Sequence, residues 1–363
     1  MSTLLIRHTD THTEYAVMDG TSLVRYEKNS KEADEILSEQ IFLARAERFQ
    51  PGNKALFVTL DGKHTGFLPY QECKSIPSSG SSLLVQVKKP PVGNKAAYVT
   101  QDISVAGKYA ILLPYSEKVS VSSRIQDPLR QQMTLLANQL RPEGMGLILR
   151  SEAAEADEEA VSSEIVVLQG RWKELLEKVS RLSAPKRVND RISALEMILR
   201  DEKGLTDACS DREETLPIPC LTVEDPFTLH KVYDKLRKRL ERNIWLPCGG
   251  YITVDPCEAL TVIDVNSGKF PGIKKDRNAG IRKLNLEAAR EIAHLMRLRN
   301  LSGIIIIDFV DMDTDEDREI ITETFSGFLA QDPVKTVIHG FTALGLMEMT
   351  RKRTARICPA TEE

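Results

Sequence analysis

Hydrophobic and polar positions alternate along short stretches in the first hundred residues. Three stretches, at Thr3–Ile6, Glu14–Asp19 and Leu23–Tyr26, predict a small β-meander. A charged segment at Lys31–Glu39 then follows a helix-like pattern. Five further stretches, separated by turn residues, predict a small barrel of the OB type. These five are Ile41–Arg48, Ala55–Leu60, Gly66–Leu68, Leu83–Lys88 and Ala96–Thr100.

The middle of the chain carries helical spacing. Apolar residues at intervals of four, three and four predict a helix over Pro128–Leu140. Asp225 and Pro226 supply a cap and a first turn for a basic helix over Phe227–Arg242. Residues Ala184–Pro219 show no clear pattern. The other expected elements are strands at Lys108–Leu113 and Gly146–Arg150 and a helix at Glu155–Ser180.

The last third of the chain alternates between apolar strands and amphipathic helices. Strands that alternate with helices predict a largely parallel, helix-covered sheet. We therefore expect an α/β fold with several domains. The strands are expected at Gly250–Val254, Ala259–Asn266, Gly303–Val310 and Val334–Ile338, and the helices at Leu284–Asn300 and Glu316–Gln331.

Composition and charge narrow the class of protein. The chain has 363 residues, of which 41% are hydrophobic and 28% are charged, which excludes a wholly disordered chain and suggests two to four domains. Its net charge is −4, yet residues 227–300 hold fifteen Lys and Arg against eight Asp and Glu. That stretch could hold a polyanion, but on charge alone solvated helix faces are the better interpretation.

Neither a membrane segment nor a disulfide framework is expected. No stretch of about 18 uncharged apolar residues occurs, and the first ten residues contain no apolar signal region. We therefore expect a cytoplasmic protein without a membrane span. The six cysteines contain no CxxC pair, so a four-cysteine zinc site within one chain is not expected.

The candidate chemistry lies where two apolar strands end. Asp264 and Asn266 alternate onto one face at the end of the first strand, and Asp308 ends the second. A helix joins the strands, so a right-handed parallel crossover would bring their carboxyl ends to one edge of the sheet. Two close carboxylates favour Mg²⁺, with Mn²⁺ as an alternative. Aspartates also end strands as turn starters, and that interpretation stays open.

These segments resemble a known family. "EALTVIDVNSG" (Glu258–Gly268), "NLEAAREIAHLMRLRNLSGIIIIDFVDM" (Asn285–Met312) and "ALGLMEMTRKR" (Ala343–Arg353) are similar to the ribonuclease E/G family of bacterial endoribonucleases. Upstream segments agree in the right order. They are "FVTLDGKHTGFLP" (Phe57–Pro69), "GNKAAYVTQDISVAGKY" (Gly93–Tyr109) and "RPEGMGLILRS" (Arg141–Ser151).

The resemblance implies an arrangement of domains. It implies an N-terminal ribonuclease-H-like domain, interrupted by an OB-fold barrel and a small 5′-sensor domain, followed by a deoxyribonuclease-I-like α/β sheet domain. On this sequence the parts fall at 1–38 and 185–240 for the ribonuclease-H-like domain, 39–102 for the barrel, 103–184 for the sensor, 241–357 for the catalytic domain and 358–363 for a truncated zinc-link remnant.

The resemblance also implies roles for single residues. A catalytic Mg²⁺ would be held by Asp264 and Asp308, assisted by Asn266. The RNA contacts of the barrel fall on Phe57, Phe67 and Lys95, although an arbitrary Phe in such a barrel is more often core. The sensor of a 5′-monophosphate falls on Arg150 and Ser151, where the family usually has Thr at the second position. An alternative for Arg150 is a pair with Glu152 or Glu155.

The zinc-binding motif of the family is incomplete in this chain. The family often has CPxC, in which two chains share one zinc ion. Here Cys358 is followed by Thr361 in place of the second cysteine, and thiolates are what would hold zinc. We therefore expect no zinc and an unpaired Cys358, and we leave a homodimer open.

Three functions remain in competition. The first is an endoribonuclease that hydrolyses single-stranded, AU-rich RNA with a Mg²⁺-activated water and leaves 5′-phosphate and 3′-hydroxyl ends, in RNA processing or decay. The second is an RNA-binding regulatory protein with weak or no cleavage activity. The third is a metal phosphatase for small phosphoesters, which would leave the barrel unexplained.

Overall fold

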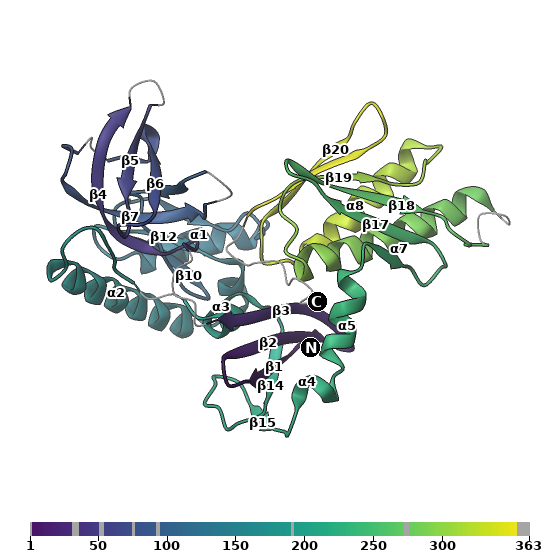
Figure 1. Ribbon diagram of the computed structural model, residues 1–363, viewed down its shortest axis with the longest axis horizontal. Helices are drawn as coiled ribbons and strands as arrows, with labels where there is room; N and C mark the ends of the chain where they lie inside the picture. The colour runs from purple at the N-terminus through teal and green to yellow at the C-terminus, as the bar shows by residue number, and fades with distance from the viewer. Residues whose placement is uncertain are drawn as a thin grey trace. The chain divides into compact units, whose positions relative to one another are not determined.

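The structure is a computed structural model that describes residues 2–30, 36–50, 54–74, 77–91, 95–189, 192–271 and 276–353 (Figure 1). The chain divides into two compact units. One unit combines Met1–Ala33 with Ser193–Glu363, and the other is the intervening segment Asp34–Ile192. The two units are described separately below.

The first unit contains a five-stranded sheet. Its strands come from the parts of the chain before and after the intervening segment. Its strand order is β15-β14-β1-β2-β3. The first strand pairs antiparallel with β2 and parallel with β14, so the early meander is extended by strands about two hundred residues later. Its strands are β1 (Ser2–His8), β2 (His12–Asp19), β3 (Ser22–Ser30), β14 (Leu205–Ser210) and β15 (Cys220–Thr222).

Helices pack on both faces of this sheet. The helix α3 (Ala194–Asp201) begins with a capping box between Ser193 and Glu196 and buries Ile198 against one face. The other face is covered by α4 (Pro226–Leu229) and α5 (Val232–Leu240). The single helix expected over Phe227–Arg242 is wrong, because Lys231 adopts a left-handed conformation with φ 53° and separates the two.

The second unit begins with a closed barrel. Its strand order is β4-β5-β6-β8-β7, and β7 pairs back onto β4. This order confirms the OB-type barrel, and the short β13 (Lys186–Arg187) adds to β4 from outside. The strands are β4 (Ile41–Gln50), β5 (Ala55–Thr59), β6 (Thr65–Pro69), β7 (Ser82–Lys89) and β8 (Ala97–Thr100), with the 3₁₀ turn η2 (Tyr70–Glu72) after β6.

The interior of the barrel explains one glycine of its sequence. A Cβ at Gly66 would lie 2.9 Å from a methyl of Val58 and 3.1 Å from Leu60 and Val99, so only glycine fits without a shift. The helix expected at Lys31–Glu39 is not seen in its described part, residues 36–39. Residues 31–35 lie outside the described residues, and the described remainder forms a turn.

The rest of the second unit is a four-stranded sheet with two helices. The strand order is β11-β12-β10-β9, and the helices pack on it through Met133, Ala137, Ile165 and Leu168. The elements are β9 (Val105–Ala106), β10 (Ala110–Leu113), β11 (Val119–Val121), β12 (Gly146–Leu149), α1 (Leu129–Leu140), η3 (Ser151–Glu155) and α2 (Glu158–Ser180).

The first unit ends in a six-stranded sheet of order β16-β17-β18-β19-β21-β20. The expectation of a largely parallel sheet is wrong: β18 and β19 are parallel, while every other neighbouring pair is antiparallel. The elements are β16 (Asn243–Trp245), β17 (Tyr251–Pro256), β18 (Leu260–Asn266), β19 (Gly303–Asp308), β20 (Thr336–Phe341), β21 (Met347–Arg351), α7 (Arg277–Leu298) and α8 (Asp315–Leu329).

Local chain geometry explains the antiparallel pairs. A short turn returns β17 onto β18 as a hairpin, and β21 inserts between β19 and β20. The fully buried Arg351 holds β21 in place: its Nε donates to Asp332 Oδ2 at 2.7 Å, and its Nη1 donates to Asn300 Oδ1 at 2.9 Å. The sequence pattern did not predict β21 or β16.

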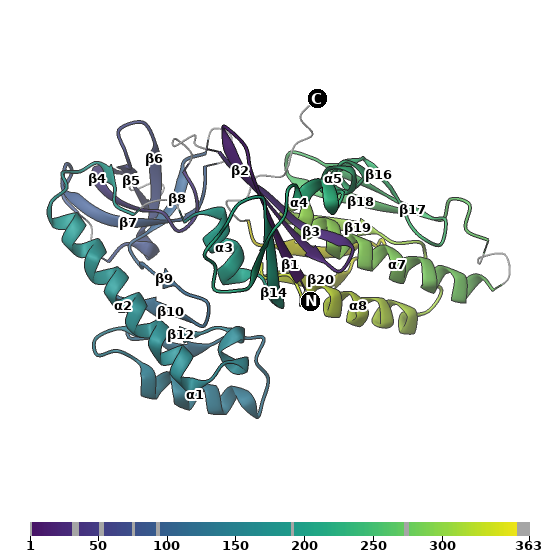
Figure 2. The ribbon, with the colours of Figure 1, turned by 90° about the horizontal axis from the view of Figure 1, so that it is seen from below.

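The two helices α7 and α8 lie on the same face of this sheet (Figure 2). Ile263, Val265, Ile305 and Ile307 point toward them and are buried in one core. Side chains in the alternate positions lie on the opposite face, where Ile304 is 49% exposed. We call this opposite side the open face of the sheet.

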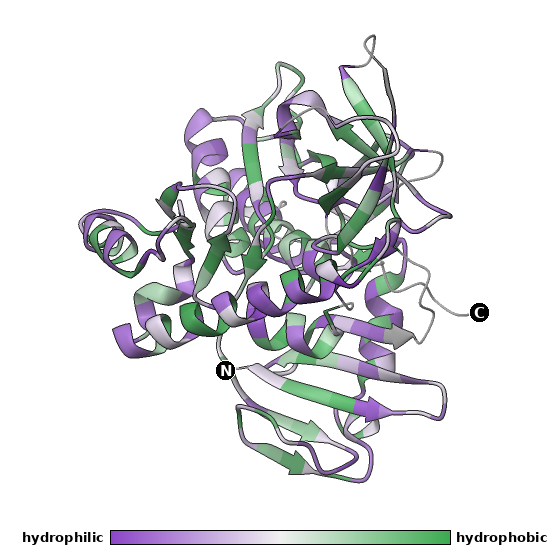
Figure 3. Ribbon diagram, turned by 90° about the vertical axis from the view of Figure 1, so that its left-hand side faces the viewer, coloured by the Kyte–Doolittle hydropathy of each residue, from purple (hydrophilic) through white to green (hydrophobic). Residues whose placement is uncertain are grey.

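The helices of both units are amphipathic. Polar and apolar bands alternate along them in Figure 3, whereas the strands are mostly apolar. Across the described parts of the chain, no helix combines the length and the apolar character needed to cross a membrane.

Candidate active site

The carboxylates predicted from the strand ends meet in the structure. Because β18 and β19 are parallel and in register, Asp264 lies directly beside Asp308 at their carboxyl ends. Both alternate onto the open face, since the flanking Ile263, Val265 and Ile307 are buried against the helices. The parallel crossover through α7 therefore builds the pair, as we expected.

The charges of this pair are not balanced by a basic side chain in the part of the chain that the structure describes. Burial raises the pKa of the Asp308 carboxyl above its usual value, and the negative charges of Asp264 and Asp311 raise it further. Among the described residues, no basic side chain contributes to the pKa shift of Asp308. The repulsion between two neighbouring carboxylates is relieved by a proton or by a bound cation.

Asn266 completes the arrangement. Its Nδ2 donates a hydrogen bond of 2.7 Å to Oδ2 of Asp264. The bond ties one carboxylate oxygen down and leaves the other available. The sequence predicted that the two side chains share a face, and the structure shows that they are bonded.

The donor set suits a hard cation. The available donors are carboxylate and amide oxygens, which Mg²⁺ and Mn²⁺ prefer, whereas zinc prefers nitrogen and sulfur. In the residues that the structure describes, no group of three or more His, Cys, Asp or Glu could enclose a metal ion. Mg²⁺ is commonly held by one or two carboxylates with waters on its other sides. Asp264 and Asp308 therefore fit Mg²⁺.

The aromatic residues predicted for RNA contact lie together on the barrel. Phe57 and Phe67 are cross-strand partners, with ring centroids 5.6 Å apart at 68°. Both are partly exposed, whereas Leu56, Val58 and Leu68 beside them are buried. The two rings therefore lie on the outer surface of the barrel and not in its core. Lys95 is also exposed and lies two residues before β8.

The aromatic surface extends further than the sequence predicted. Tyr98 on β8 is the strand partner of Phe67, and their ring centroids lie 6.2 Å apart. Lys89 places its ammonium 5.5 Å from the centroid of the Tyr98 ring. We missed both residues, although Tyr98 lies between the buried Ala97 and Val99, and that alternation would have placed it outside.

The side chains predicted to sense a 5′-phosphate are already bonded to other groups of the protein. Nη1 of Arg150 donates to the carbonyl of Gly107 at 2.6 Å, and its Nε lies 3.8 Å from Oε2 of Glu152. The Ser151 hydroxyl donates to both carboxylate oxygens of Glu152 at 3.1 Å. Arg150 and Ser151 are adjacent, as the sequence requires, but Glu152 engages both. The alternative of a pair between Arg150 and Glu152 is thus present.

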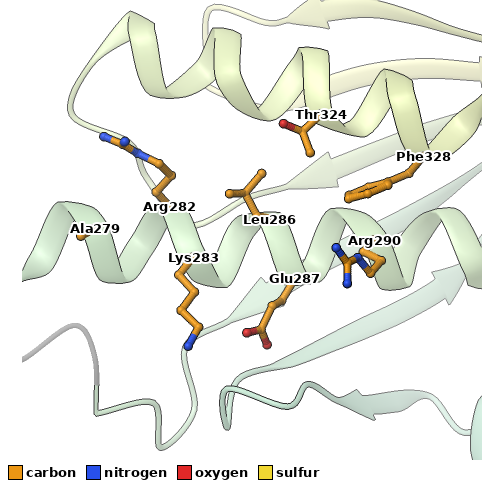
Figure 4. A pocket seen from close by; sticks show the side chains of 8 residues that line it. All are labelled: Ala279, Arg282, Lys283, Leu286, Glu287, Arg290, Thr324 and Phe328. Atoms are coloured by element: carbon orange, nitrogen blue, oxygen red, sulfur yellow. The ribbon is translucent and has the colours of Figure 1, made fainter.

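A pocket lies away from the carboxylates. Figure 4 shows that its side chains come from α7 and α8, which cover the face of the sheet opposite Asp264 and Asp308. It is lined by Ala279, Arg282, Lys283, Leu286, Glu287, Arg290, Thr324 and Phe328. The position of the pocket therefore gives no support to the carboxylate site. The predicted zinc-link remnant at 358–363, including Cys358, lies outside the described residues.

Comparisons with known proteins agree on a family. The model of the "Ribonuclease E/G family" matches residues 104–217 and 217–354. Ribonuclease G of Escherichia coli (strain K12) is 31% identical over 394 aligned positions, which cover 97% of this chain and 80% of that protein.

Two further relatives extend the comparison. Ribonuclease G of Haemophilus influenzae is 31% identical, covering 97% of this chain and 79% of that protein. Ribonuclease E of Synechocystis sp. is 33% identical over 86% of this chain, which corresponds to 52% of that protein. The family match covers more than half of the chain, so this protein belongs to the ribonuclease E/G family.

Proposed function

We propose that this protein is an endoribonuclease that hydrolyses single-stranded RNA, with Mg²⁺ held by Asp264 and Asp308. The observation that carries the proposal is the facing pair of carboxylates; burial, and then the charge of Asp264, raise the pKa of Asp308. Relatives named ribonuclease G and ribonuclease E support RNA as the substrate. We place the activity in RNA processing or decay.

The residues at the carboxylate site have different proposed roles. When bound, Mg²⁺ would supply an activated water and stabilise negative charge on the phosphoryl group. Asn266 holds the Asp264 carboxylate in one orientation through its 2.7 Å bond. Among the described residues, α7 and α8 pack against the other face of the sheet, so the open face can give an extended strand access to the pair.

The products follow from attack by water. Water adds to the phosphorus and the bond between phosphorus and O3′ breaks, so the upstream piece keeps a 3′-hydroxyl and the downstream piece carries a 5′-phosphate. A histidine-based cut that passes through a cyclic phosphate is disfavoured. His294, for example, directs its Nε2 to the carbonyl oxygen of Leu23 at 2.5 Å, and it lies on α7 away from the carboxylates.

The barrel supplies a surface for bases. The rings of Phe57, Phe67 and Tyr98 form a continuous stripe across three strands. Stacking on such rings contributes about 1–3 kcal/mol per base and tolerates different sequences. The proposed preference for AU-rich RNA comes from the family resemblance, because no side chain here accounts for it.

The proposal is tested with two fluorescent AU-rich oligonucleotides, one with a 5′-monophosphate and one with a 5′-hydroxyl. Each is incubated with the wild type or with Asp264→Asn, in Mg²⁺ or in chelator. We expect cleavage only when both Mg²⁺ and Asp264 are present. Asp315→Asn, whose side chain is 90% exposed on α8, is the matched control and should cut as the wild type does.

Three results would contradict the proposal. Equal cleavage by Asp264→Asn would show that the carboxylate pair is structural. Binding of both oligonucleotides without cleavage under every condition would favour the RNA-binding regulatory protein. Cleavage of a chromogenic phosphomonoester, with RNA left intact, would favour the phosphatase.

A further inference from the structure

An exposed tryptophan lies on the same sheet as the carboxylates. Trp245 ends the edge strand β16 and is 61% exposed, although its neighbour Ile244 is buried in the core. Its ring lies 5.1 Å from that of Tyr251, at an angle of 51°. Tyr251 is half-buried. Tryptophan and tyrosine are enriched at interfaces, where one end of the ring is apolar and the other is in contact with water.

Strand register places this aromatic pair beside the carboxylates. Trp245 pairs with Tyr251, and Tyr251 pairs with Asn266 on β18. Residues directly opposite one another in antiparallel strands share a face of the sheet. Asn266 shares its face with Asp264, two residues earlier. Trp245, Tyr251, Asn266 and Asp264 are therefore all on the open face.

Two glycines, Gly250 and Gly268, lie in close contact with the chain around Tyr251. A Cβ on Gly268 would lie 2.8 Å from the carbonyl oxygen of Gly249 and 3.3 Å from Cδ1 of Tyr251. A Cβ on Gly250 would meet Leu284 at 2.4 Å and the carbonyl oxygen of Asn266 at 2.8 Å. Side chains at these two positions would push the strands apart. The glycines thus keep the Tyr251 ring against the end of β18.

The geometry points to an RNA base as the ligand of this pair. We propose that Trp245 and Tyr251 form a stacking subsite for a base next to the phosphodiester that is cut. The inference rests on the proposed function, because the neighbouring carboxylates are what would attract the backbone of the same strand through a bound cation. Aromatic rings accept any base through its π-face, so this subsite would position the strand and not read its sequence.

A second copy of this chain is the competing occupant. An exposed tryptophan is also typical of protein interfaces. We favour RNA because the pair lies beside polar side chains of the carboxylate site, Asn266 and Asp264. The choice is decided by experiment.

Binding is measured with the cleavage step removed. In an Asp308→Asn background, a single-stranded uridine heptamer is titrated against tryptophan fluorescence. The chain has two tryptophans, and the other, Trp172, is 4% exposed. We expect saturable quenching that disappears in Trp245→Phe. Quenching that persists in Trp245→Phe would overturn the proposal.

Kinetics provide the second measurement. Trp245→Ala should lower kcat/KM for a single-stranded RNA by roughly 5- to 100-fold, and Tyr251→Leu should lower it less. Trp245→Phe keeps a ring and should restore most of the rate, which a purely structural effect of lost volume would not require. Leu344→Ala, at an 85% exposed position in the turn between β20 and β21, is the control and should cut normally.

The outcomes separate this inference from the proposed function. If the wild type cuts RNA and Trp245→Ala cuts equally well, the stacking subsite is wrong and the nuclease stands. If the wild type cuts nothing, the nuclease is wrong, and the quenching titration still decides whether Trp245 contacts RNA. A change in sedimentation with unchanged RNA affinity in Trp245→Ala would assign the surface to a second copy of the chain and overturn the inference.

Discussion

The carboxylate site and the Arg150–Ser151 site differ in how their charges are balanced. At the first, Asp264 and Asp308 lie side by side without a basic partner among the described residues. At the second, Glu152 lies 3.8 Å from the Arg150 guanidinium and accepts the Ser151 hydroxyl. The two carboxylates of the first site repel each other, whereas the charge of Arg150 at the second site is paired with Glu152.

This difference shows how a family motif should be interpreted. A site with unbalanced charge is stabilised when it binds an ion of opposite charge. A site with balanced charge must first give up its internal pair before it binds anything. Residues that match the family motif are therefore stronger support for a binding role at the carboxylate pair than at Arg150 and Ser151.

The largest expected effect is at the unbalanced site. Asp308→Asn should lower the rate of RNA cleavage by about a thousandfold or more, because it removes a proposed metal ligand. Without Mg²⁺ the melting temperature should not fall, since the substitution also removes the repulsion with Asp264. Cleavage assays and thermal melts check both halves, and a strongly destabilised variant would mean that Asp308 is mainly structural.

Saturating Mg²⁺ should also stabilise the wild type. At a concentration one hundred times its dissociation constant, a ligand that binds only the folded state adds about 2.7 kcal/mol. Asp308→Asn should lose most of this increase, whereas Asp315→Asn should keep it. Thermal melts across a Mg²⁺ series measure the difference, and an equal increase in Asp308→Asn would place the cation elsewhere.

A smaller effect is expected from the residue that orients the pair. Asn266→Ala removes the 2.7 Å bond to Asp264, and by analogy with groups that orient metal ligands it should cost about 10- to 100-fold in kcat or in Mg²⁺ affinity. Titration of activity against Mg²⁺ separates the two. Activity equal to that of the wild type at every Mg²⁺ concentration would remove Asn266 from the site.

The aromatic surface should affect binding rather than chemistry. Phe67 lies between Phe57 and Tyr98, so Phe67→Ala should weaken binding of single-stranded RNA by roughly 5- to 30-fold. Phe67→Tyr keeps the ring and serves as the matched control. Fluorescence anisotropy in the Asp308→Asn background measures affinity without turnover. Unchanged affinity in Phe67→Ala would return the two phenylalanines to a structural role.

The smallest effect is expected at the balanced site. Glu152→Gln removes the negative charge beside Arg150 and should raise the preference for a 5′-monophosphate by about two- to fivefold, which is typical of a partly exposed ion pair. The ratio of cleavage rates for the two oligonucleotides measures this, with Glu158→Gln at the start of α2 as the control. A preference already large in the wild type would show that Glu152 yields readily to a phosphate.

The sequence predicted most strongly those features that depend on local periodicity. The strands of the barrel and the helices at Leu129–Leu140 and Glu158–Ser180 follow from apolar spacing, because each buries a face defined by a few neighbouring residues. The approach of Asp264 to Asp308 was also predictable, since one helical crossover fixes two strands as parallel.

The sequence failed where distant segments choose their partners. The strand β21 was missed because its buried Arg351 looks unlike a core residue until Asp332 and Asn300 are brought around it. The directions of the remaining strands depend on which neighbour each one finds, and apolar spacing contains no information on that choice.

By itself, the sequence determined the OB-type barrel, the helices α1, α2, α7 and α8 and the meeting of two carboxylates, because these arise from short-range periodicity and one constrained crossover. Only the tertiary structure decided that the last sheet is mainly antiparallel with one open face, that Trp245 and Tyr98 join the surfaces beside the predicted residues, and that Arg150 donates to the carbonyl of Gly107. The physical reason is that strand pairing and the hydrogen bond from Arg150 to Gly107 join residues far apart in the chain.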